Sequence, residues 1–346
     1  MLNFAIDFGN GFVKAMNGKR SIVAPSSIDK LTSLGKGSLE DLMIDDTKAY
    51  NVYESNIDDG IKYIWGEGIE KVSSEPLVTH TSLERYETKR FKLLCEFVLA
   101  ELSSDYQENE LDDVLLVTGM PSQEIGTKEE KIFKKFLEGK HLVERNNKQM
   151  LINVKQVKIV EQPMGSLLDA YMTEDGKMYN SLKHDTITVI DFGAGTTIFD
   201  TFRGLRRLPN ESKTRYEGMN HLYQNIENDL IQKYDIKTNV VNQIKEGFQD
   251  GSLCAKIGQK RLPFDDIAKE HIELFINRFI TDFESKISSL DAINVFVLTG
   301  GGLNIVGDFF KSEAKSITNN VDVNYAEDSQ KSNIRGFYKL SSILSK

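Results

Sequence analysis

Cysteine is scarce in this sequence, which restricts the covalent and metal chemistry that the chain can carry. Only two cysteines occur in 346 residues, Cys95 and Cys254, and neither has a partner at metal-ligand spacing. We therefore expect two buried or unreactive thiols and a reducing, cytoplasmic location. Histidines show no metal-ligand spacing either, and we expect surface or packing positions for His80, His141, His184, His221 and His271.

Long apolar runs and a net positive charge are also absent. No stretch approaches the roughly 18 apolar residues that a membrane-spanning helix needs. The first predicted strand already ends at Asp7, so we expect neither a signal peptide nor an N-terminal membrane anchor. With 43 basic against 52 acidic residues the formal net charge is −9, which argues against strong direct binding of nucleic acid.

One pattern occurs twice in the chain. Ile-Asp-Phe-Gly-x-Gly begins at residue 6 and again at residue 190, so that Asp7 and Asp191 are 184 residues apart. The apolar runs VLLVTG (114–119) and VFVLTG (295–300) follow in the same order at a spacing of 181 residues. Two pairs at nearly one spacing predict a duplicated unit, and a chain of this length is expected to form two similar α/β domains.

Apolar periodicity predicts strands and helices along both halves. The expected strands cover 4–6, 12–16, 21–23, 113–119, 186–190, 196–202 and 294–299, and another begins at 154. The expected helices cover 81–102, 127–138, 163–171, 219–233, 265–287, 303–316 and the C-terminal segment 332–344. We expect a small subdomain at 27–80, which holds the only tryptophan. We expect the basic segment 204–218 to be a solvated loop, with a filament or nucleotide contact as the alternative.

Glycine-rich turns after a strand are typical of phosphate-binding sites, and the sequence distinguishes among the known kinds. The P-loop pattern is absent, and the dinucleotide pattern G-x-G-x-x-G fails because Lys14 and Ile198 occupy the third glycine position. Both turns are followed by β-branched and aromatic residues, which favour a second strand over a helix. Each turn is therefore expected at the tip of a β-hairpin, where glycine lets backbone N–H groups approach an anion.

An aspartate precedes each turn, although a carboxylate repels phosphate unless a cation lies between them. Mg²⁺ takes oxygen ligands, keeps several waters and bridges carboxylates to phosphates. We expect Asp7 and Asp191 to face each other across a cleft and share one Mg²⁺ through water, with Lys14 as a point charge on a phosphate. A plain hairpin turn is the alternative for either motif taken alone.

A third glycine-rich segment, Gly300–Gly302, lies between a buried strand and an apolar helix. Bare backbone there suits close approach of a nucleoside and its phosphates, and a flexible loop is the alternative. With the segment VEQPMGSLLDAY (160–171), the chain then holds four motifs in order. The set resembles the actin-type ATPase superfamily, in which a phosphate hairpin, a connecting helix, a second hairpin and an adenosine motif follow one another. Asp7 and Lys14 keep the spacing of the actin pattern.

The resemblance spans the whole chain, which within the superfamily is most similar to ParM-like actins that segregate bacterial plasmids. It implies an actin-like α/β fold of two ribonuclease H-like domains with a nucleotide cleft between them. Domain I would cover 1–165, with a subdomain at about 27–80, and would be completed by the C-terminal helix 325–346. Domain II would cover 166–324, with a subdomain at about 204–264.

The resemblance also implies a set of site residues. Glu161 would hold the attacking water, with the adjacent Gln162 as second choice and Asp7 and Asp191 completing the catalytic set. Alternatively, Glu161 is only a carboxylate favoured at a helix start. ATP, with GTP as the alternative nucleotide, would contact Asn10 at its terminal phosphate and also Gly11, Phe12, Lys14, Gly193, Ala194, Gly195, Thr196, Gly218, Gly300, Gly301, Gly302 and Asn304.

The implied function is ATP-driven assembly of filaments that hydrolysis makes unstable. Expected partners are other copies of the chain and a DNA-binding adaptor of the ParR type, without strong direct nucleic-acid binding and without a membrane. Another bacterial actin-like ATPase or a small-molecule kinase of the same fold is the alternative, although no base for an acceptor hydroxyl is evident. A chaperone would need a further substrate-binding domain, and a cell-shape actin usually carries a membrane-binding segment.

Overall fold

The computed structural model describes residues 1–34, 50–73, 75–79, 84–318 and 321–345. These residues divide into two compact units. The first contains Met1–Met178 and Asn333–Lys346, and the second contains Tyr179–Ser332. The unit limits thus lie at residues 178 and 332, where the sequence analysis expected them after 165 and 324.

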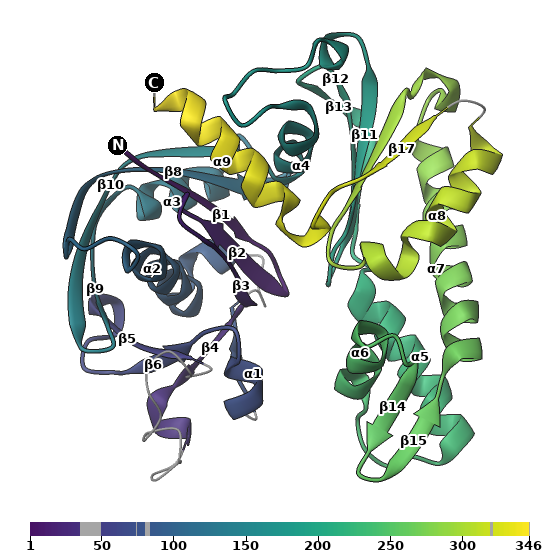
Figure 1. The fold of residues 1–346 in the computed structure, drawn as a ribbon, viewed down its shortest axis with the longest axis horizontal. Coiled ribbons are helices and arrows are strands. Elements are labelled where there is room, and N and C mark those ends of the chain that lie inside the picture. Colours follow the sequence, from purple (N-terminus) through teal and green to yellow (C-terminus); the bar gives the residue numbers. More distant parts are fainter. Residues whose placement is uncertain (35–49, 74, 80–83, 319–320, 346) are drawn as a thin grey trace. The chain divides into compact units, whose positions relative to one another are not determined.

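A ten-stranded mixed sheet runs through the described part of the first unit (Figure 1). Its strand order is β3-β2-β1-β8-β10-β9-β5-β6-β4-β7. β1 pairs antiparallel with β2 and parallel with β8, which in turn pairs parallel with β10. The strands are β1 (Leu2–Phe8), β2 (Phe12–Met16), β3 (Ser21–Pro25), β4 (Ser27–Lys30), β5 (Asn51–Ser55), β6 (Tyr63–Trp65), β7 (Leu77–Val78), β8 (Glu110–Met120), β9 (Gly139–Arg145) and β10 (Lys148–Glu161).

The described part of segment 27–80 continues this sheet. β5 pairs antiparallel with β9, and β6 pairs with both β5 and β4. Trp65 is buried there and donates its indole N–H to the carbonyl of Pro25 at 2.9 Å. Residues 35–49, His80 and the first residues of the expected helix 81–102 lie outside the described residues.

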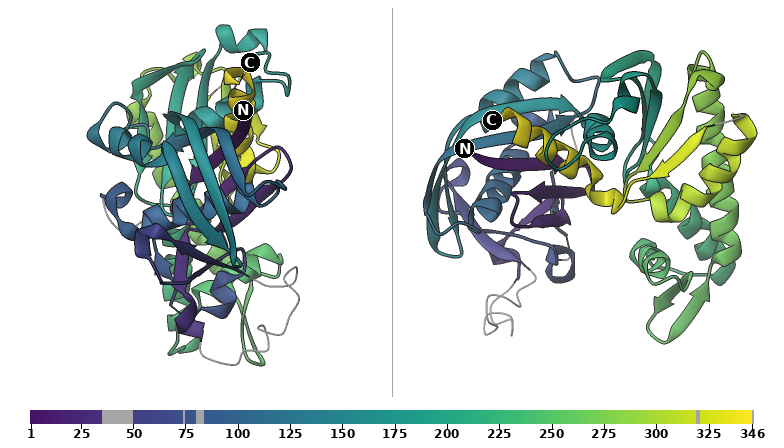
Figure 2. Two further views of the ribbon diagram at one scale, coloured as in Figure 1. Left: turned by 90° about the vertical axis from the view of Figure 1, so that its left-hand side faces the viewer. Right: turned by 45° about the horizontal axis from the view of Figure 1, so that its top comes forward.

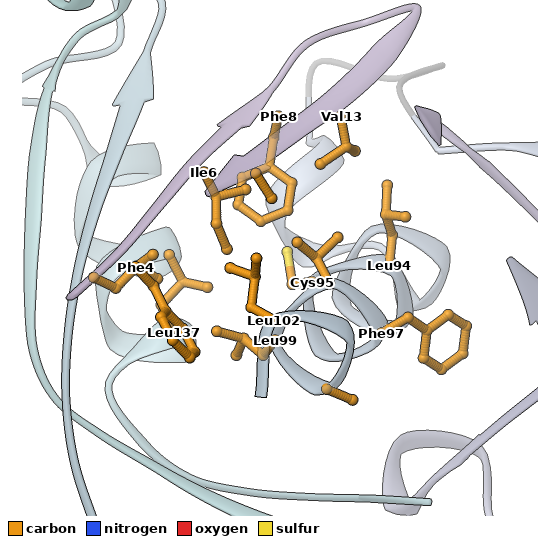
Figure 3. Packing of buried hydrophobic residues seen from close by; sticks show 14 of the residues in the cluster. Phe4, Ile6, Phe8, Val13, Leu94, Cys95, Phe97, Leu99, Leu102 and Leu137 are labelled. Carbon is orange, nitrogen blue, oxygen red and sulfur yellow. The ribbon is translucent and has the colours of Figure 1, made fainter. Parts of the chain in front are cut away.

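Helices cover the two faces of the sheet in the first unit. Phe4, Ile6 and Phe8 of β1 point toward α2 and its Cys95 (Figure 3). Burial raises the pKa of the Cys95 thiol well above its ordinary value, and Cys254 is also buried and free, which confirms the expectation of two buried thiols. The helices are α1 (Ile69–Val72), α2 (Lys89–Ser103), α3 (Lys128–Leu137), α4 (Gln162–Tyr171) and α9 (Ser332–Leu344).

The opposite face of β1 packs against α9. Because side chains alternate along a strand, Ala5 and Asp7 share this face, and Ala5 clusters with Phe337 of α9. The two ends of the chain lie side by side, as Figures 1 and 2 show, and the Asn3 amide donates to the Ser345 hydroxyl at 3.1 Å. The C-terminal helix is therefore docked on the first unit, as its apolar pattern predicts.

The second unit repeats half of the first sheet. Its five-stranded sheet has the order β13-β12-β11-β16-β17, which corresponds strand by strand to β3-β2-β1-β8-β10. Directions also agree, because β11 pairs antiparallel with β12 and parallel with β16. The duplication predicted from the sequence is confirmed. The strands are β11 (Thr186–Phe192), β12 (Thr197–Arg203), β13 (Arg206–Arg215), β14 (Cys254–Ile257), β15 (Lys260–Pro263), β16 (Val295–Thr299) and β17 (Asp322–Tyr325).

Four helices accompany these strands in the described part of the second unit. Ile190 and Phe192 of β11 lie in one apolar core with residues of α5, α7 and α8. Phe279 of α7 contacts the ring of Phe192 with ring centroids 5.7 Å apart. The helices are α5 (Met219–Tyr234), α6 (Val241–Gln249), α7 (Asp265–Lys286) and α8 (Leu303–Ile317).

Two local predictions were wrong. Segment 204–218 is not a solvated loop, because Arg206–Arg215 forms strand β13, antiparallel to β12. The sequence did not predict this strand because its charged residues are typical of a solvated loop. In the fold one of these charges is paired, with Arg207 and Asp200 2.7 Å apart. The helix expected from residue 81 starts only at Lys89, because Thr88 is extended and its hydroxyl caps the helix.

Candidate functional site

The first glycine-rich turn joins β1 to β2 as a hairpin, as expected. A Cβ on Gly9 would lie 2.7 Å from the carbonyl oxygen of Phe12 and 3.0 Å from Nζ of Lys14, so this position requires glycine. Ser26 forms two hydrogen bonds with the turn. Its hydroxyl donates to the Gly9 carbonyl at 2.6 Å, and its N–H donates to the Gly11 carbonyl at 3.0 Å.

Asp7, one residue before the end of β1, is a buried carboxylate with two polar side-chain partners among the described residues. It lies opposite Lys14 in the hairpin register, and Nζ of Lys14 is 3.4 Å from Oδ2 of Asp7. The Asn333 amide also donates to Oδ2 at 3.4 Å, while its own oxygen accepts from the Ser166 hydroxyl at 2.7 Å. These contacts hold the carboxylate in place, and a carboxylate oxygen is the kind of ligand that Mg²⁺ takes.

The second turn has the same hairpin form in the second unit. Asp191 is buried near the end of β11, and the Gly193 N–H donates to the Thr196 carbonyl at 2.9 Å. A Cβ on Gly193 would lie 2.9 Å from that same carbonyl oxygen. Asp191 faces Ile198 in the register, so only the first hairpin places a lysine opposite its aspartate.

Gly218 packs directly against the second turn. A Cβ there would lie 2.5 Å from the Thr196 nitrogen and 2.6 Å from the Gly193 oxygen. The first amides of α5 donate into the turn, with Met219 N–H to the Gly193 carbonyl at 3.0 Å and Asn220 N–H to the Ala194 carbonyl at 2.8 Å. These amides of the α5 N-terminus therefore hold the turn.

The triple glycine lies beside Asp191. Gly300 has a φ of +95°, and a Cβ on it would contact the Asp191 carboxylate and lie 2.6 Å from the Phe192 oxygen. Gly302 donates its N–H to that Phe192 oxygen at 2.9 Å. Gly301 is exposed with nothing within 4 Å of a Cβ, and Asn304 is exposed on α8. Gly193 and Gly300 thus lie beside Asp191, and Gly218 lies against the turn that follows it.

Glu161 lies at the junction of β10 and α4. It is half-buried, pairs in register with Met120 of β8, and occupies the N-cap position of α4 without a capping hydrogen bond from its side chain. Gln162 begins the helix and is also half-buried, with Pro163 in the first turn. The Glu161 carboxylate therefore does not serve as a cap for α4.

Three contributors to the first hairpin escaped sequence reasoning: Ser26, Arg85 and Asn333. Arg85 donates from Nη1 to Oδ1 of Asn10 at 3.1 Å and from Nη2 to the Phe8 carbonyl at 3.0 Å. No local signal identifies these side chains, since each reaches the hairpin from a segment outside the motif. A search for basic or amide side chains near the start of the next helix would have included Arg85.

The described residues contain no cluster of three or more His, Cys, Asp or Glu side chains that would hold a metal by itself. Buried His141 packs between Glu96, at 3.1 Å, and the Leu137 carbonyl, at 3.0 Å. A hydrated Mg²⁺ held by single carboxylates and phosphates needs no such cluster. Within the same part of the chain, no helix has the length and apolar character of a membrane span.

Comparisons with known proteins agree with this geometry. Residues 5–165 match the family model described as the N-terminal domain of actin like proteins. The crystal structure of the apo psk41 ParM protein is 30% identical and has a TM-score of 0.79, with 99% of this chain and 98% of that chain covered. No curated protein sequence matches the chain.

Two more distant structures share the fold. The archaeal actin homolog Ta0583 in complex with ADP is 16% identical with a TM-score of 0.76, and the match covers 99% of this chain and 100% of that chain. A 15-stranded ParM filament from Clostridium botulinum is 15% identical with a TM-score of 0.75, and 99% of each chain is covered.

The paired sheets and hairpins define an actin-type fold, so the predicted two-domain, actin-like α/β class is confirmed. The chain belongs to the actin-like proteins, the family that includes ParM.

Proposed function

We propose that this chain is a nucleotide-dependent, polymerising ATPase of the cytoplasm, whose dynamic filaments segregate plasmid DNA through a DNA-binding adaptor of the ParR type. The observation that carries the proposal is the repeated hairpin, which places a buried aspartate and a glycine turn at the same position of two equivalent sheets. Self-assembly is supported by the likeness to ParM, a filament of which is among the similar structures. Nucleotide binding is supported by the ADP complex of the archaeal homolog.

The proposed nucleotide site uses residues from both hairpins. Asp7 and Asp191 are the residues proposed to hold Mg²⁺, each through water. Mg²⁺ supplies charge neutralisation at the phosphates when bound. Lys14 contributes a cation on a phosphate, and Asn10 donates to the terminal phosphate. Backbone and side-chain contacts are proposed for Gly11, Phe12, Gly193, Ala194, Gly195, Thr196, Gly218, Gly300, Gly301, Gly302 and Asn304.

Glu161 is the proposed acceptor that orients the attacking water, and Gln162 is the second choice. A water molecule must be held in line with the terminal phosphate by such a group. The position of Glu161 at the junction of β10 and α4 supports this role, because its carboxylate makes no capping hydrogen bond with the helix. ATP is the proposed nucleotide and GTP the alternative.

Assembly of purified protein tests this function. At tens of micromolar protein, ATP with Mg²⁺ should raise light scattering and give filaments in electron micrographs, whereas EDTA should suppress both. Protein that hydrolyses ATP yet stays monomeric would contradict the filament proposal and favour a kinase of the same fold. The segregation role is tested separately by the rate of plasmid loss in cells that lack the protein.

A further inference from the structure

Arg85 connects the first glycine turn to the helix that covers the core of the first unit. It lies in a short 3₁₀ turn, Arg85–Glu87, immediately before α2. Its two terminal nitrogens donate to Oδ1 of Asn10 at 3.1 Å and to the Phe8 carbonyl at 3.0 Å. Both acceptors are neutral, and within the described residues no carboxylate forms an ion pair with Arg85. Among the described residues, the turn is therefore contacted by a guanidinium that has no carboxylate partner.

The packing fixes this guanidinium in position. Its central carbon lies 4.8 Å from the ring centroid of Tyr86 and 5.0 Å from that of Phe91. Tyr86 is held in turn by a hydrogen bond from its hydroxyl to Glu124 at 2.5 Å. Nε of Arg85 is buried without a hydrogen-bond partner among the described residues. The two hydrogen bonds to the turn are therefore the only side-chain hydrogen bonds that Arg85 makes with the described residues.

The contact dictates how the Asn10 amide is oriented. A guanidinium has only donors, so the Asn10 atom that faces it must be the amide oxygen. The amide nitrogen, with its two donors, then points away from Arg85 and has no protein acceptor among the described residues. Phosphate oxygens only accept hydrogen bonds. An unrestrained asparagine can rotate its amide and present its oxygen to phosphate, which is repulsive.

We propose that Arg85 is a positioning residue for the terminal phosphate. It locks the Asn10 amide so that the nitrogen donates to that phosphate, and it thereby sets the preference for nucleoside triphosphate over diphosphate. This inference rests on the proposed nucleotide function. It assigns to Arg85 an effect transmitted through Asn10, which a purely structural arginine would not have.

The test compares affinities for β,γ-imido-ATP and ADP by calorimetry, at protein concentrations below those that scatter light. Arg85→Gln should weaken binding of β,γ-imido-ATP by roughly tenfold and leave ADP binding within about twofold. Arg90→Gln, which removes the same charge from an exposed position in the first turn of α2, should change neither. The double variant Arg85→Gln/Asn10→Ala should bind β,γ-imido-ATP no more weakly than Asn10→Ala alone.

Equal losses for the two nucleotides, or additive losses in the double variant, would overturn the inference while leaving the proposed function intact. Wild-type protein that binds neither nucleotide would overturn both. If Arg85→Gln does not fold, Arg85→Lys provides the second variant, since it keeps the charge and at most one of the two hydrogen bonds. It should then show a smaller loss that is again confined to β,γ-imido-ATP, and a loss of equal size for ADP would overturn the inference.

Discussion

Asn333 donates its side-chain amide to the Asp7 carboxylate, with Nδ2 and Oδ2 3.4 Å apart, although 326 residues separate them in the sequence. The oxygen of the same amide accepts from the N–H of Ser166 at 3.1 Å and from its hydroxyl at 2.7 Å. One asparagine at the start of α9 thus joins the end of β1 to helix α4. The C-terminal helix is therefore part of the support for the predicted metal residue.

Replacing Asn333 should weaken the first unit. Asn333→Ala removes two buried hydrogen bonds with Ser166 and one with Asp7, and the loss of such bonds is expected to cost about 1–3 kcal/mol. Urea denaturation should show this loss in the free energy of unfolding. Ser166→Ala should cost less once Asn333 is already alanine, because the two side chains act as a pair. Strictly additive losses would show that the contact contributes nothing.

Gly218→Ala should displace the second turn. The added methyl carbon would meet backbone atoms of Thr196, Gly193 and Ala194 at 2.5, 2.6 and 2.7 Å, and backbone cannot move aside without cost. We expect a loss of about 1–3 kcal/mol in stability and weaker nucleotide binding. Gly301→Ala is the matched control, because nothing lies within 4 Å of its Cβ and stability should hardly change. Equal melting temperatures for the two variants would contradict the packing argument.

Glu161→Ala should slow phosphate release while leaving nucleotide binding in place. Loss of the group that orients the water is expected to cost roughly 10²–10⁴-fold in hydrolysis rate. Filaments should then persist longer after ATP is added, as seen by light scattering. Gln162→Ala changes the neighbouring side chain and should have the smaller effect. Unchanged hydrolysis in Glu161→Ala together with slow hydrolysis in Gln162→Ala would transfer the role to Gln162.

Asp191→Asn should abolish the Mg²⁺ dependence of nucleotide binding. The substitution keeps the shape that packs against Gly300 but removes the charge that attracts the ion. Titrations with Mg²⁺ and with EDTA, each read out as nucleotide affinity, would detect the change, and circular dichroism would confirm the fold. Asp7→Asn should behave in the same way. Normal Mg²⁺-dependent binding in both variants would rule out these aspartates as the metal residues.

Much of the fold was predictable because its signals are local. Strand β2 was predicted to the residue at 12–16, and α4 begins within one residue of Pro163 as expected. A glycine turn after a short apolar strand can be predicted from a few neighbouring residues. Because the same pattern occurs twice, the two turns together indicate the duplicated actin-like fold more strongly than either turn does alone. The start of α2 was not predictable, since the apolar period continues through Tyr86 while the backbone turns at Thr88.

The sequence by itself determined the duplicated architecture and the two hairpins, because apolar period, β-branched residues and glycine act over a few positions. Only the tertiary structure decided which side chains support those hairpins. Arg85 and Asn333 reach the first turn through packing of α2 and α9, and Gly218 reaches the second through the start of α5. Strand β13 is likewise a tertiary outcome, because two of its arginines are withdrawn from solvent only in the fold, where Arg207 pairs with Asp200 and Arg215 pairs with Asp282. Contacts of this kind join residues that are far apart in the sequence, so a local sequence pattern does not predict them.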